Sequence, residues 1–339
     1  MFKIRISKTI PTAPIMVRSF DQFTLLFSSL SAKIALYQAT CEQARLVNPN
    51  YKTIGADSDP ACIGAKEIDS FVKIPPIQEF NQENLLHFCK ENNIQFVIPT
   101  RDGELLFWAV HQEFLFNHQI GVMISSQSAI SLCEDKYSFF KYFEKGPIPS
   151  IRTSFSLDAL PSYCERFVVK ERMGSASRSI GLNLNSEEVD FHLKSINEPI
   201  FQPQINGREL SAETWIDRNG LCHGVVLRWR ILIIDGESHE SEIFSNPEWT
   251  EKLIQTFSMI SGLQGHVLAQ VIVDDEGCLH LVEINPRLGG ASPLSLKAGL
   301  NSIKWSLQEF IGEPDQIPKS PILKNKLRLS KKNQVVKIQ

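Results

Sequence analysis

The chain has 339 residues, of which 42% are hydrophobic and 22% are charged, values typical of globular proteins. A chain of this length is expected to form two or three domains, each with its own core. The formal net charge of −3 gives no excess of basic residues for binding nucleic acid or an anionic membrane, so neither partner is predicted.

The seven cysteines are spaced singly, without a C-x-x-C pair, and an odd number leaves one thiol over in any disulfide scheme. This pattern predicts reduced thiols in a cytoplasmic protein. The most apolar internal run, 224–234, contains Arg228 and Arg230 and is much shorter than the roughly 18 residues of a transmembrane helix. A membrane span is therefore not predicted.

Short apolar runs alternate with helical patterns in the first third of the chain. Strands are expected at 23–27, 52–56, 70–73, 94–98 and 122–124, and helices at 32–44, 83–91 and 104–116. Such alternation is typical of a doubly wound parallel sheet, in which ligands bind at the carboxyl ends of the strands. The turn at 28–32 lacks G-x-G-x-x-G, so this Rossmann-like layout does not indicate a dinucleotide site.

From Asp135 onward, the pattern changes to strands joined by hairpins, which predicts an antiparallel α+β architecture. A helix is expected at 135–145, a strand at 166–170 and a Gly- and Ser-rich loop at 172–179. Two hairpins are predicted, joining 209–216 to 221–234 and 266–273 to 278–284. One long helix at 291–311 and an edge strand or hairpin near 326–329 complete the prediction.

The segment 281–290, Leu-Val-Glu-Ile-Asn-Pro-Arg-Leu-Gly-Gly, indicates the chemistry most clearly. In a strand, Glu283 and Asn285 share one face, and Arg287 follows directly. Carboxylate and amide oxygens are ligands that Mg²⁺ prefers, and a guanidinium can hold a phosphoryl group or a carboxylate by two hydrogen bonds. A polar strand end in solvent is the alternative, but the attached P-R-L-G-G favours a functional site.

The second predicted hairpin brings another oxygen ligand to the same face. If its turn pairs Val273 with Cys278, Gln270 lies opposite Leu281 and diagonal to Glu283. The sequence therefore predicts a cluster of Gln270, Glu283 and Asn285 that binds a divalent cation.

These motifs, with Glu134-Asp135-Lys136 and Val168-Val169-Lys170, resemble the ATP-grasp superfamily, and within it a single-copy member of the carbamoyl-phosphate-synthase-like branch. The resemblance extends from residue 23 to about residue 338. It implies a Rossmann-like pre-ATP-grasp domain at 1–130, followed by a two-subdomain ATP-grasp fold. The small subdomain, the nucleotide lid, is expected at 131–203, and the large subdomain, with the metal and acyl phosphate, at 204–339.

The resemblance also implies roles for individual residues. The ATP-binding residues would be Lys136, Lys170, Gly174, Ser175, Ser177, Gln202, Gln204, Ile205 and Glu209. The loop from Gly174 to Ser177 would fold over the phosphates, and the backbone of 202–205 would hydrogen-bond the adenine. Mg²⁺ or Mn²⁺ would be held by Gln270, Glu283 and Asn285, and Arg287, helped by Arg230, would steady the acyl phosphate. The residues that choose the substrates are expected among Asp57, Arg101, Asp102, Glu104 and Ser292.

Some residues depart from this pattern or carry no predicted role. Gln202 stands where many relatives carry a carboxylate for the ribose hydroxyls, so its bond to the ribose would lack charge assistance. For Arg228, a functional role and a place on an exposed sheet face stay equally open. The eight histidines show no paired ligand spacing, and none is assigned.

Three functions stay open. The first is a ligase that transfers the γ-phosphoryl of ATP to a substrate carboxylate and joins the acyl group to an amine, with a small-molecule carboxylate and amine as partners and homodimer formation left open. The second is an enzyme that activates bicarbonate, as in carbamoyl phosphate synthesis. The chain has a single copy of the ATP-grasp unit, which disfavours the version of that reaction with two phosphorylation steps. The third is an ATP-binding module without turnover, which Gln202 favours and Glu283, Asn285 and Arg287 oppose.

Overall fold

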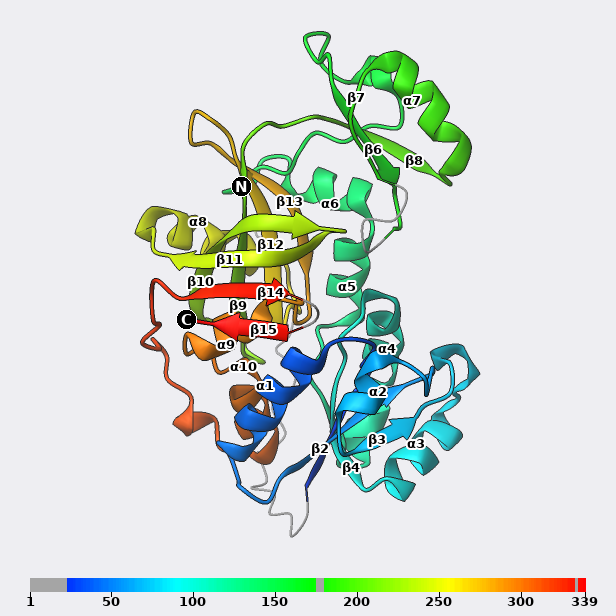
Figure 1. Cartoon of the computed structure of the whole chain (residues 1–339), viewed down its shortest axis with the longest axis vertical. Helices are drawn as coiled ribbons and strands as arrows, with labels where there is room; N and C mark the ends of the chain where they lie inside the picture. Colours follow the sequence, from blue (N-terminus) through cyan, green and yellow to red (C-terminus); the bar gives the residue numbers. More distant parts are fainter. Residues whose placement is uncertain (1–22, 175–179, 333–334) are drawn as a thin grey trace, which may run out of the picture.

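The computed structural model describes residues 23–174, 180–332 and 335–339, which form three sheets with flanking helices (Figure 1). The parallel sheet lies at one end of the molecule and the three-stranded sheet at the other, with the seven-stranded sheet between them. The predicted combination of a Rossmann-like domain with antiparallel sheets is confirmed. Within the described residues, none of the helices has the length and apolar character needed to span a bilayer.

The first sheet is entirely parallel, with the order β3-β2-β1-β4-β5. Its strands are β1 Thr24–Phe27, β2 Lys52–Asp57, β3 Phe71–Lys73, β4 Ile94–Ile98 and β5 Gly121–Val122. The helices around it are α1 Ile34–Arg45, α2 Ile63–Glu67, α3 Gln82–Glu91 and α4 Asp102–Asn117, with the 3-10 turn Ile77–Glu79. Leu25 and Leu26 are both buried, in different core clusters, as expected for a sheet covered on both faces. The strand order reverses between β1 and β4, where open α/β sheets bind ligands.

Two helices, α5 Gln127–Glu134 and α6 Lys136–Phe143, lead to the three-stranded antiparallel sheet. This sheet has the order β7-β6-β8, from β6 Phe167–Glu171, β7 Gly181–Leu184 and β8 Pro199–Pro203. The helix α7 Ser186–His192 and the 3-10 turns Leu157–Ala159 and Leu193–Ser195 accompany it. Phe167, Val169 and Phe201 point into the core under α7. Val168, Lys170 and Gln202 therefore lie on the opposite face of the sheet.

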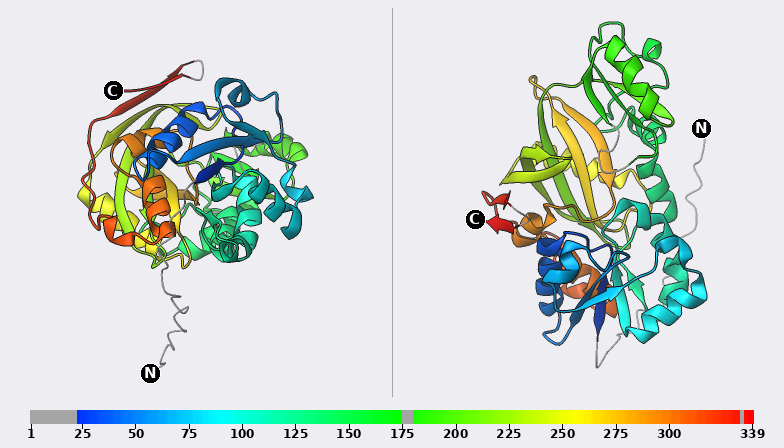
Figure 2. Two further views of the ribbon diagram at one scale, coloured as in Figure 1. Left: turned by 90° about the horizontal axis from the view of Figure 1, so that it is seen from below. Right: turned by 45° about the vertical axis from the view of Figure 1, so that its right-hand side comes forward.

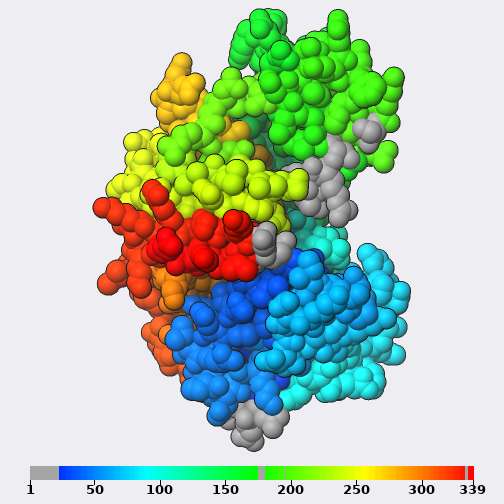
Figure 3. Space-filling model, in the orientation of Figure 1, coloured from blue at the N-terminus to red at the C-terminus, as the bar shows by residue number. Residues whose placement is uncertain are grey.

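The seven-stranded antiparallel sheet has the order β13-β12-β9-β10-β11-β14-β15. Its strands are β9 Arg208–Ile216, β10 Cys222–Ile234, β11 Glu237–Phe244, β12 Gly265–Val273, β13 Leu279–Asn285, β14 Arg328–Lys332 and β15 Val335–Ile338. The C-terminal hairpin of β14 and β15, red in Figure 3, pairs along β11, so the predicted hairpin is confirmed, while the edge strand is β15 rather than the strand expected near 326–329. The helix α8 Pro247–Ser258 packs on one face of the sheet.

Helices on the other face connect this sheet to the parallel sheet. They are α9 Ser292–Lys297 and α10 Ser302–Ile311, and the 3-10 turn Pro314–Gln316 follows. Phe310 packs against Phe23 and Phe96 of the parallel domain, while Trp305 packs against Trp215 of β9. Figure 2 shows these orange helices beside the blue α1. A shared apolar core thus fixes the two sheets relative to each other.

The predicted single helix at 291–311 is wrong, because the chain breaks after α9. Gly299 has a φ of +108°, a conformation that side-chain-bearing residues rarely adopt. Its N–H bonds to Leu296 O, and the N–H of Leu300 bonds to Ser295 O, which ends the first helix. The chain then starts a second helix at Ser302.

The predicted hairpin register is also wrong by one residue at the turn. Val273 pairs with Leu279, and Val271 pairs with Leu281. The register then shifts, so that Gln270 pairs with Glu283 and Val282 is an extra residue in β13. This bulge places Gln270 directly opposite Glu283 rather than diagonal to it.

Candidate active site

Polar side chains gather on one face of the seven-stranded sheet, close to where β13 ends. The Nδ2 of Asn285 donates to Glu283 Oε1 at 2.7 Å. Arg230 Nη1 donates to Gln270 Oε1 at 2.9 Å and to Glu209 Oε2 at 2.6 Å. We call these five residues the outer cluster. The structure thus brings Glu209 and Arg230 to the predicted metal ligands.

The outer cluster has the donor chemistry that Mg²⁺ requires. Gln270, Glu283 and Asn285 supply one carboxylate and two amide oxygens, which are hard ligands suited to Mg²⁺ or Mn²⁺ together with phosphate oxygens. Among the described residues, no group of three or more His, Cys, Asp or Glu side chains is placed to hold a metal ion. The mixed amide and carboxylate set therefore stays the candidate metal site, as the sequence predicts.

Two lysines stand within electrostatic reach of Glu283. Lys170, on β6, is only 8% exposed, and no hydrogen bond or ion pair joins its ammonium to another described residue. Burial lowers the pKa of Lys170 to about 8. Attraction by Glu283 opposes this lowering, and repulsion by Lys136 adds to it. Burial also lowers the pKa of Lys136, against attraction by Glu283 and Asp102. A polyphosphate with its metal ion would supply the negative charge that these ammonium groups lack.

The predicted phosphate loop is anchored at its start. Arg172 makes two hydrogen bonds to Asp135, at 2.9 and 2.5 Å, and these bonds hold the pKa of that carboxyl well below its usual range. The same carboxylate caps α6 at Tyr137 and Ser138. The ammonium of Lys136 donates to the carbonyl of Gly174. Ser175 and Ser177, which the sequence assigns to this loop, lie outside the described residues.

The predicted adenine and ribose residues lie at the end of β8. Gln202 is buried on the same face of its sheet as Lys170, and its Nε2 donates to Thr153 Oγ1 at 2.8 Å. Gln204 Nε2 donates to the carbonyl of Ile205, and its side-chain oxygen accepts the Asn183 N–H. The predicted roles toward adenine and ribose remain predictions.

Arg287 reaches across to the parallel domain. Its Nε and Nη2 donate to the two oxygens of Asp102, at 2.5 and 2.6 Å, and its Nη1 donates to Leu288 O at 3.0 Å. Asp102 is the first residue of α4, at the carboxyl edge of the parallel sheet. A residue that the sequence assigns to substrate choice therefore contacts the predicted acyl-phosphate residue directly.

The other predicted substrate residues separate into two groups. Three of them serve the backbone: Glu104 accepts the N–H groups of Thr100 and Arg101, Asp57 accepts that of Ser31, and Ser292 accepts that of Gly289. Arg101 and Glu104 both line a pocket of about 180 Å³ with Ser28, Ser29 and Ser58, at the reversal point of the strand order. Of the predicted substrate residues, Asp102 is the one whose side chain bonds to Arg287 among the described residues, and Arg101 precedes it in the chain.

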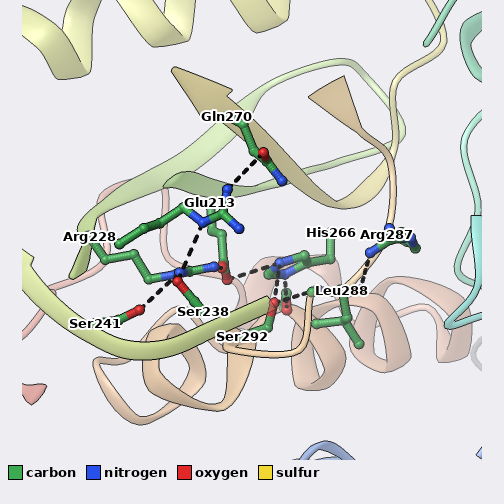
Figure 4. A network of polar contacts seen from close by, with 12 residues as sticks. Glu213, Arg228, Ser238, Ser241, His266, Gln270, Arg287, Leu288 and Ser292 are labelled. Carbon is green, nitrogen blue, oxygen red and sulfur yellow. Dashed lines mark hydrogen bonds and ion pairs between the residues drawn. The ribbon is translucent and has the colours of Figure 1, made fainter. Parts of the chain in front are cut away.

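A fully buried ionic network, the inner cluster, lies deeper on the same sheet face. It consists of Glu213, Arg228 and His266, each at most 2% exposed. Arg228 donates twice to Glu213 Oε1, at 3.0 and 2.8 Å, while His266 Nε2 lies 3.3 Å from Glu213 Oε2 (Figure 4). Burial raises the pKa of Glu213, but Arg228 and His266 outweigh it, so the net shift is downward. An exposed sheet face for Arg228 is therefore wrong.

The inner cluster also holds the loop that follows Arg287. His266 contacts Ser292 Oγ at 3.4 Å and Ser302 Oγ at 2.9 Å, and Ser292 in turn accepts the N–H of Gly289. Sequence reasoning assigned no role to Glu213 or His266. The period-2 pattern of β9 could have shown that Glu213 shares a face with Glu209, but not that both charges would find partners on other strands.

Comparisons with known proteins agree with this geometry. The profile of the ATP-grasp domain matches residues 133–291, and that of the PylC-like N-terminal domain matches residues 25–124. Residues 133–291 therefore match an ATP-grasp domain, and they follow a PylC-like N-terminal domain. No curated protein sequence matches it.

Solved structures share the fold at low sequence identity. N5-carboxyaminoimidazole synthetase from Staphylococcus aureus, solved with ADP, is 14% identical with a TM-score of 0.72 over 94% of this chain and 84% of its own. L-amino acid ligase from Bacillus licheniformis is 15% identical, with a TM-score of 0.67 over 91% and 78%. Biotin carboxylase from Campylobacter jejuni, solved with a β,γ-ATP ligand, is 16% identical, with a TM-score of 0.67 over 91% and 75%.

Proposed function

We propose that the protein is a Mg-ATP-dependent ligase, which activates a carboxylate as an acyl phosphate and joins it to an amine. The observation that carries this proposal is that Glu283, on the seven-stranded sheet, lies within electrostatic reach of Lys170 on the three-stranded sheet and of Lys136 at the start of α6. Two partly or fully buried ammonium groups that no carboxylate of the described residues pairs, beside a metal-ligand set, suit a nucleoside triphosphate better than a neutral or cationic substrate. The names of the similar structures, a synthetase and a ligase among them, support the same reaction class.

Each site residue is assigned a role in phosphoryl transfer according to its position. Lys136 and Lys170 would neutralise the ATP phosphates, while Gln270, Glu283 and Asn285 would hold Mg²⁺. The metal ion, when bound, offsets charge on the transferred group. Arg287 would stabilise the acyl phosphate, since two of its five N–H groups are not used by Asp102 or Leu288. Displacement of phosphate by the amine needs no protein nucleophile.

A bicarbonate-activating enzyme is the second candidate. The biotin carboxylase domain of Hydrogenobacter thermophilus 2-oxoglutarate carboxylase was solved with MgADP and bicarbonate, and it shares this fold with a TM-score of 0.70 at 14% identity. In that reaction, bicarbonate would take the place of the carboxylate beside Arg287. The same outer cluster would serve both substrates.

The test measures ADP release by the purified protein with Mg-ATP, a panel of small carboxylates or bicarbonate, and an amine acceptor. An acyl phosphate intermediate carries one carboxylate oxygen into the released phosphate, so an ¹⁸O-labelled carboxylate is expected to yield phosphate with one ¹⁸O. Release that responds to bicarbonate alone would favour the second candidate. If no carboxylate or bicarbonate stimulates ADP release, the ligase proposal is wrong and an ATP-binding module without turnover takes its place.

A further inference from the structure

The ion pair between Arg287 and Asp102 joins two residues 185 positions apart in the chain. Each side chain keeps only about a fifth of its surface exposed, 19% for Arg287 and 20% for Asp102. The contact is bidentate, because Nε and Nη2 each meet one carboxylate oxygen. Geometry of this kind fixes the plane of a guanidinium as well as its place.

Asp102 leaves part of the guanidinium available. A guanidinium has five N–H donors, of which the carboxylate uses two and Leu288 O uses one. Two donors remain for an anionic group. Asp102 therefore orients Arg287 without using up its hydrogen-bonding capacity.

The parallel domain does not need this ion pair in order to dock. Phe310 and other apolar side chains of α9 and α10 already join the parallel sheet to the large sheet. Asp102 instead begins α4 at the carboxyl edge of the parallel sheet, next to Arg101, which lines the pocket there. The position of the carboxylate matches a role in the site better than a role in the core.

We infer that Asp102 is a positioning residue, which holds the Arg287 guanidinium in the orientation that phosphoryl transfer requires. This inference rests on the proposed ligase function for its kinetic consequence, but the ion pair itself can be tested separately. Loss of a residue that orients a functional group commonly lowers activity about 10- to 100-fold. Nucleotide affinity is expected to stay nearly unchanged, because neither Asp102 nor Arg287 is assigned to the nucleotide.

The kinetic test is a double-mutant cycle of Asp102→Asn and Arg287→Ala. Asp102→Asn is expected to lower carboxylate-stimulated ADP formation about 10- to 100-fold in the parent and to have no further effect in Arg287→Ala. Asp102→Glu, which keeps the charge, is expected to restore part of the rate. Glu309→Gln, which breaks the ion pair with Arg218 away from this site, is the matched control and is expected to retain the parent rate. An equal loss in both backgrounds, or no loss in either, would overturn the inference.

A second readout needs no activity. In protein labelled with ¹⁵N-arginine, the Nε–H resonance of Arg287, assigned with Arg287→Lys, is expected to be protected from solvent exchange in the parent. Asp102→Asn should remove this protection, while Glu309→Gln leaves it intact. An unchanged resonance in Asp102→Asn refutes the positioning role even if the protein proves not to be a ligase. If Asp102→Asn loses this protection and the parent shows no carboxylate-stimulated ADP release, the proposed function is wrong, while the ion pair is confirmed.

Discussion

The inner and outer clusters lie on the same face of one sheet, yet they differ in how fully their charges are paired. In the inner cluster, Arg228 and His266 both meet Glu213, and all three side chains are removed from water. In the outer cluster, Glu283 accepts a hydrogen bond from the amide of Asn285 and from no other described residue, while two partly or fully buried lysines stand nearby. A set of buried charges that is already paired acts as a scaffold, whereas one with excess positive charge is ready for an anionic ligand.

The comparison also explains why the two clusters adjoin. The inner cluster fixes the loop at Gly289 through Ser292, directly after Arg287. The outer cluster can then keep its polar groups ready for a ligand, because the inner cluster fixes the same strands farther along the same face. Rigid support of this kind is what a site for phosphoryl transfer needs.

The largest effect is expected from breaking the inner cluster. Arg228→Met removes one partner of a fully buried ion pair and leaves the charge of Glu213 with only His266 beside it. The free energy of unfolding should fall by about 3–5 kcal/mol, as measured by urea denaturation. Breaking the exposed pair on α8 with Lys252→Met is the control and should change it little. Equal effects of the two variants would contradict the scaffold role.

The next effect concerns Arg287, which follows Asn285 of the outer cluster two residues later in the chain. Arg287→Ala should reduce ADP formation roughly 100-fold, or about 2.7 kcal/mol, because its guanidinium is expected to matter mainly in the transition state. Mg-ATP affinity, measured by calorimetry, should stay within a few-fold of the parent. Loss of ATP binding would instead assign Arg287 to the nucleotide pocket.

A smaller effect is expected from the titration of Lys170. Its pKa of about 8 in the free protein means that the ammonium form, which attracts phosphates, declines as pH rises above that value. ATP affinity should therefore be steady below that pH and weaken up to about tenfold per pH unit above it, with proton uptake on binding. Lys170→Arg, which stays charged, should lack this dependence. An identical pH profile in both proteins would show that Lys170 does not contact the phosphates.

The smallest effect is expected at Gln202. A carboxylate there would face the ribose hydroxyls with charge assistance, so Gln202→Glu should tighten ATP binding by up to about 1 kcal/mol. Gln204→Glu, two residues along the same segment, serves as the comparison variant in the titration. Weaker binding by Gln202→Glu would indicate that its bond to Thr153 matters more than any contact with the ribose.

Local patterns predicted the strands of the parallel sheet and, in the antiparallel sheets, β6, β9, β10, β12 and β13, because period-2 alternation and apolar runs involve only neighbouring residues. The strands β7, β8 and β11 were not predicted. They also placed Glu283 and Asn285 on one face. The bulge at Val282 and the break at Gly299 were missed, since both depend on how the segments pack rather than on residue type alone. The Arg287–Asp102 and Arg228–Glu213 pairs join separate segments, and no spacing in the sequence indicates which charges will meet.

The central claim is that Glu283 anchors the metal ion of a bound nucleotide at the outer cluster. Binding of Mn²⁺ in the presence of a non-hydrolysable ATP analogue, followed by electron paramagnetic resonance, tests it directly. The parent and Glu248→Gln, an exposed control on α8, should bind Mn²⁺ together with the nucleotide. Glu283→Gln should keep its fold, lose this Mn²⁺ binding and show no ATP turnover, because a neutral amide cannot offset the cation. Parent-like Mn²⁺ binding and turnover in Glu283→Gln would show that the metal site lies elsewhere.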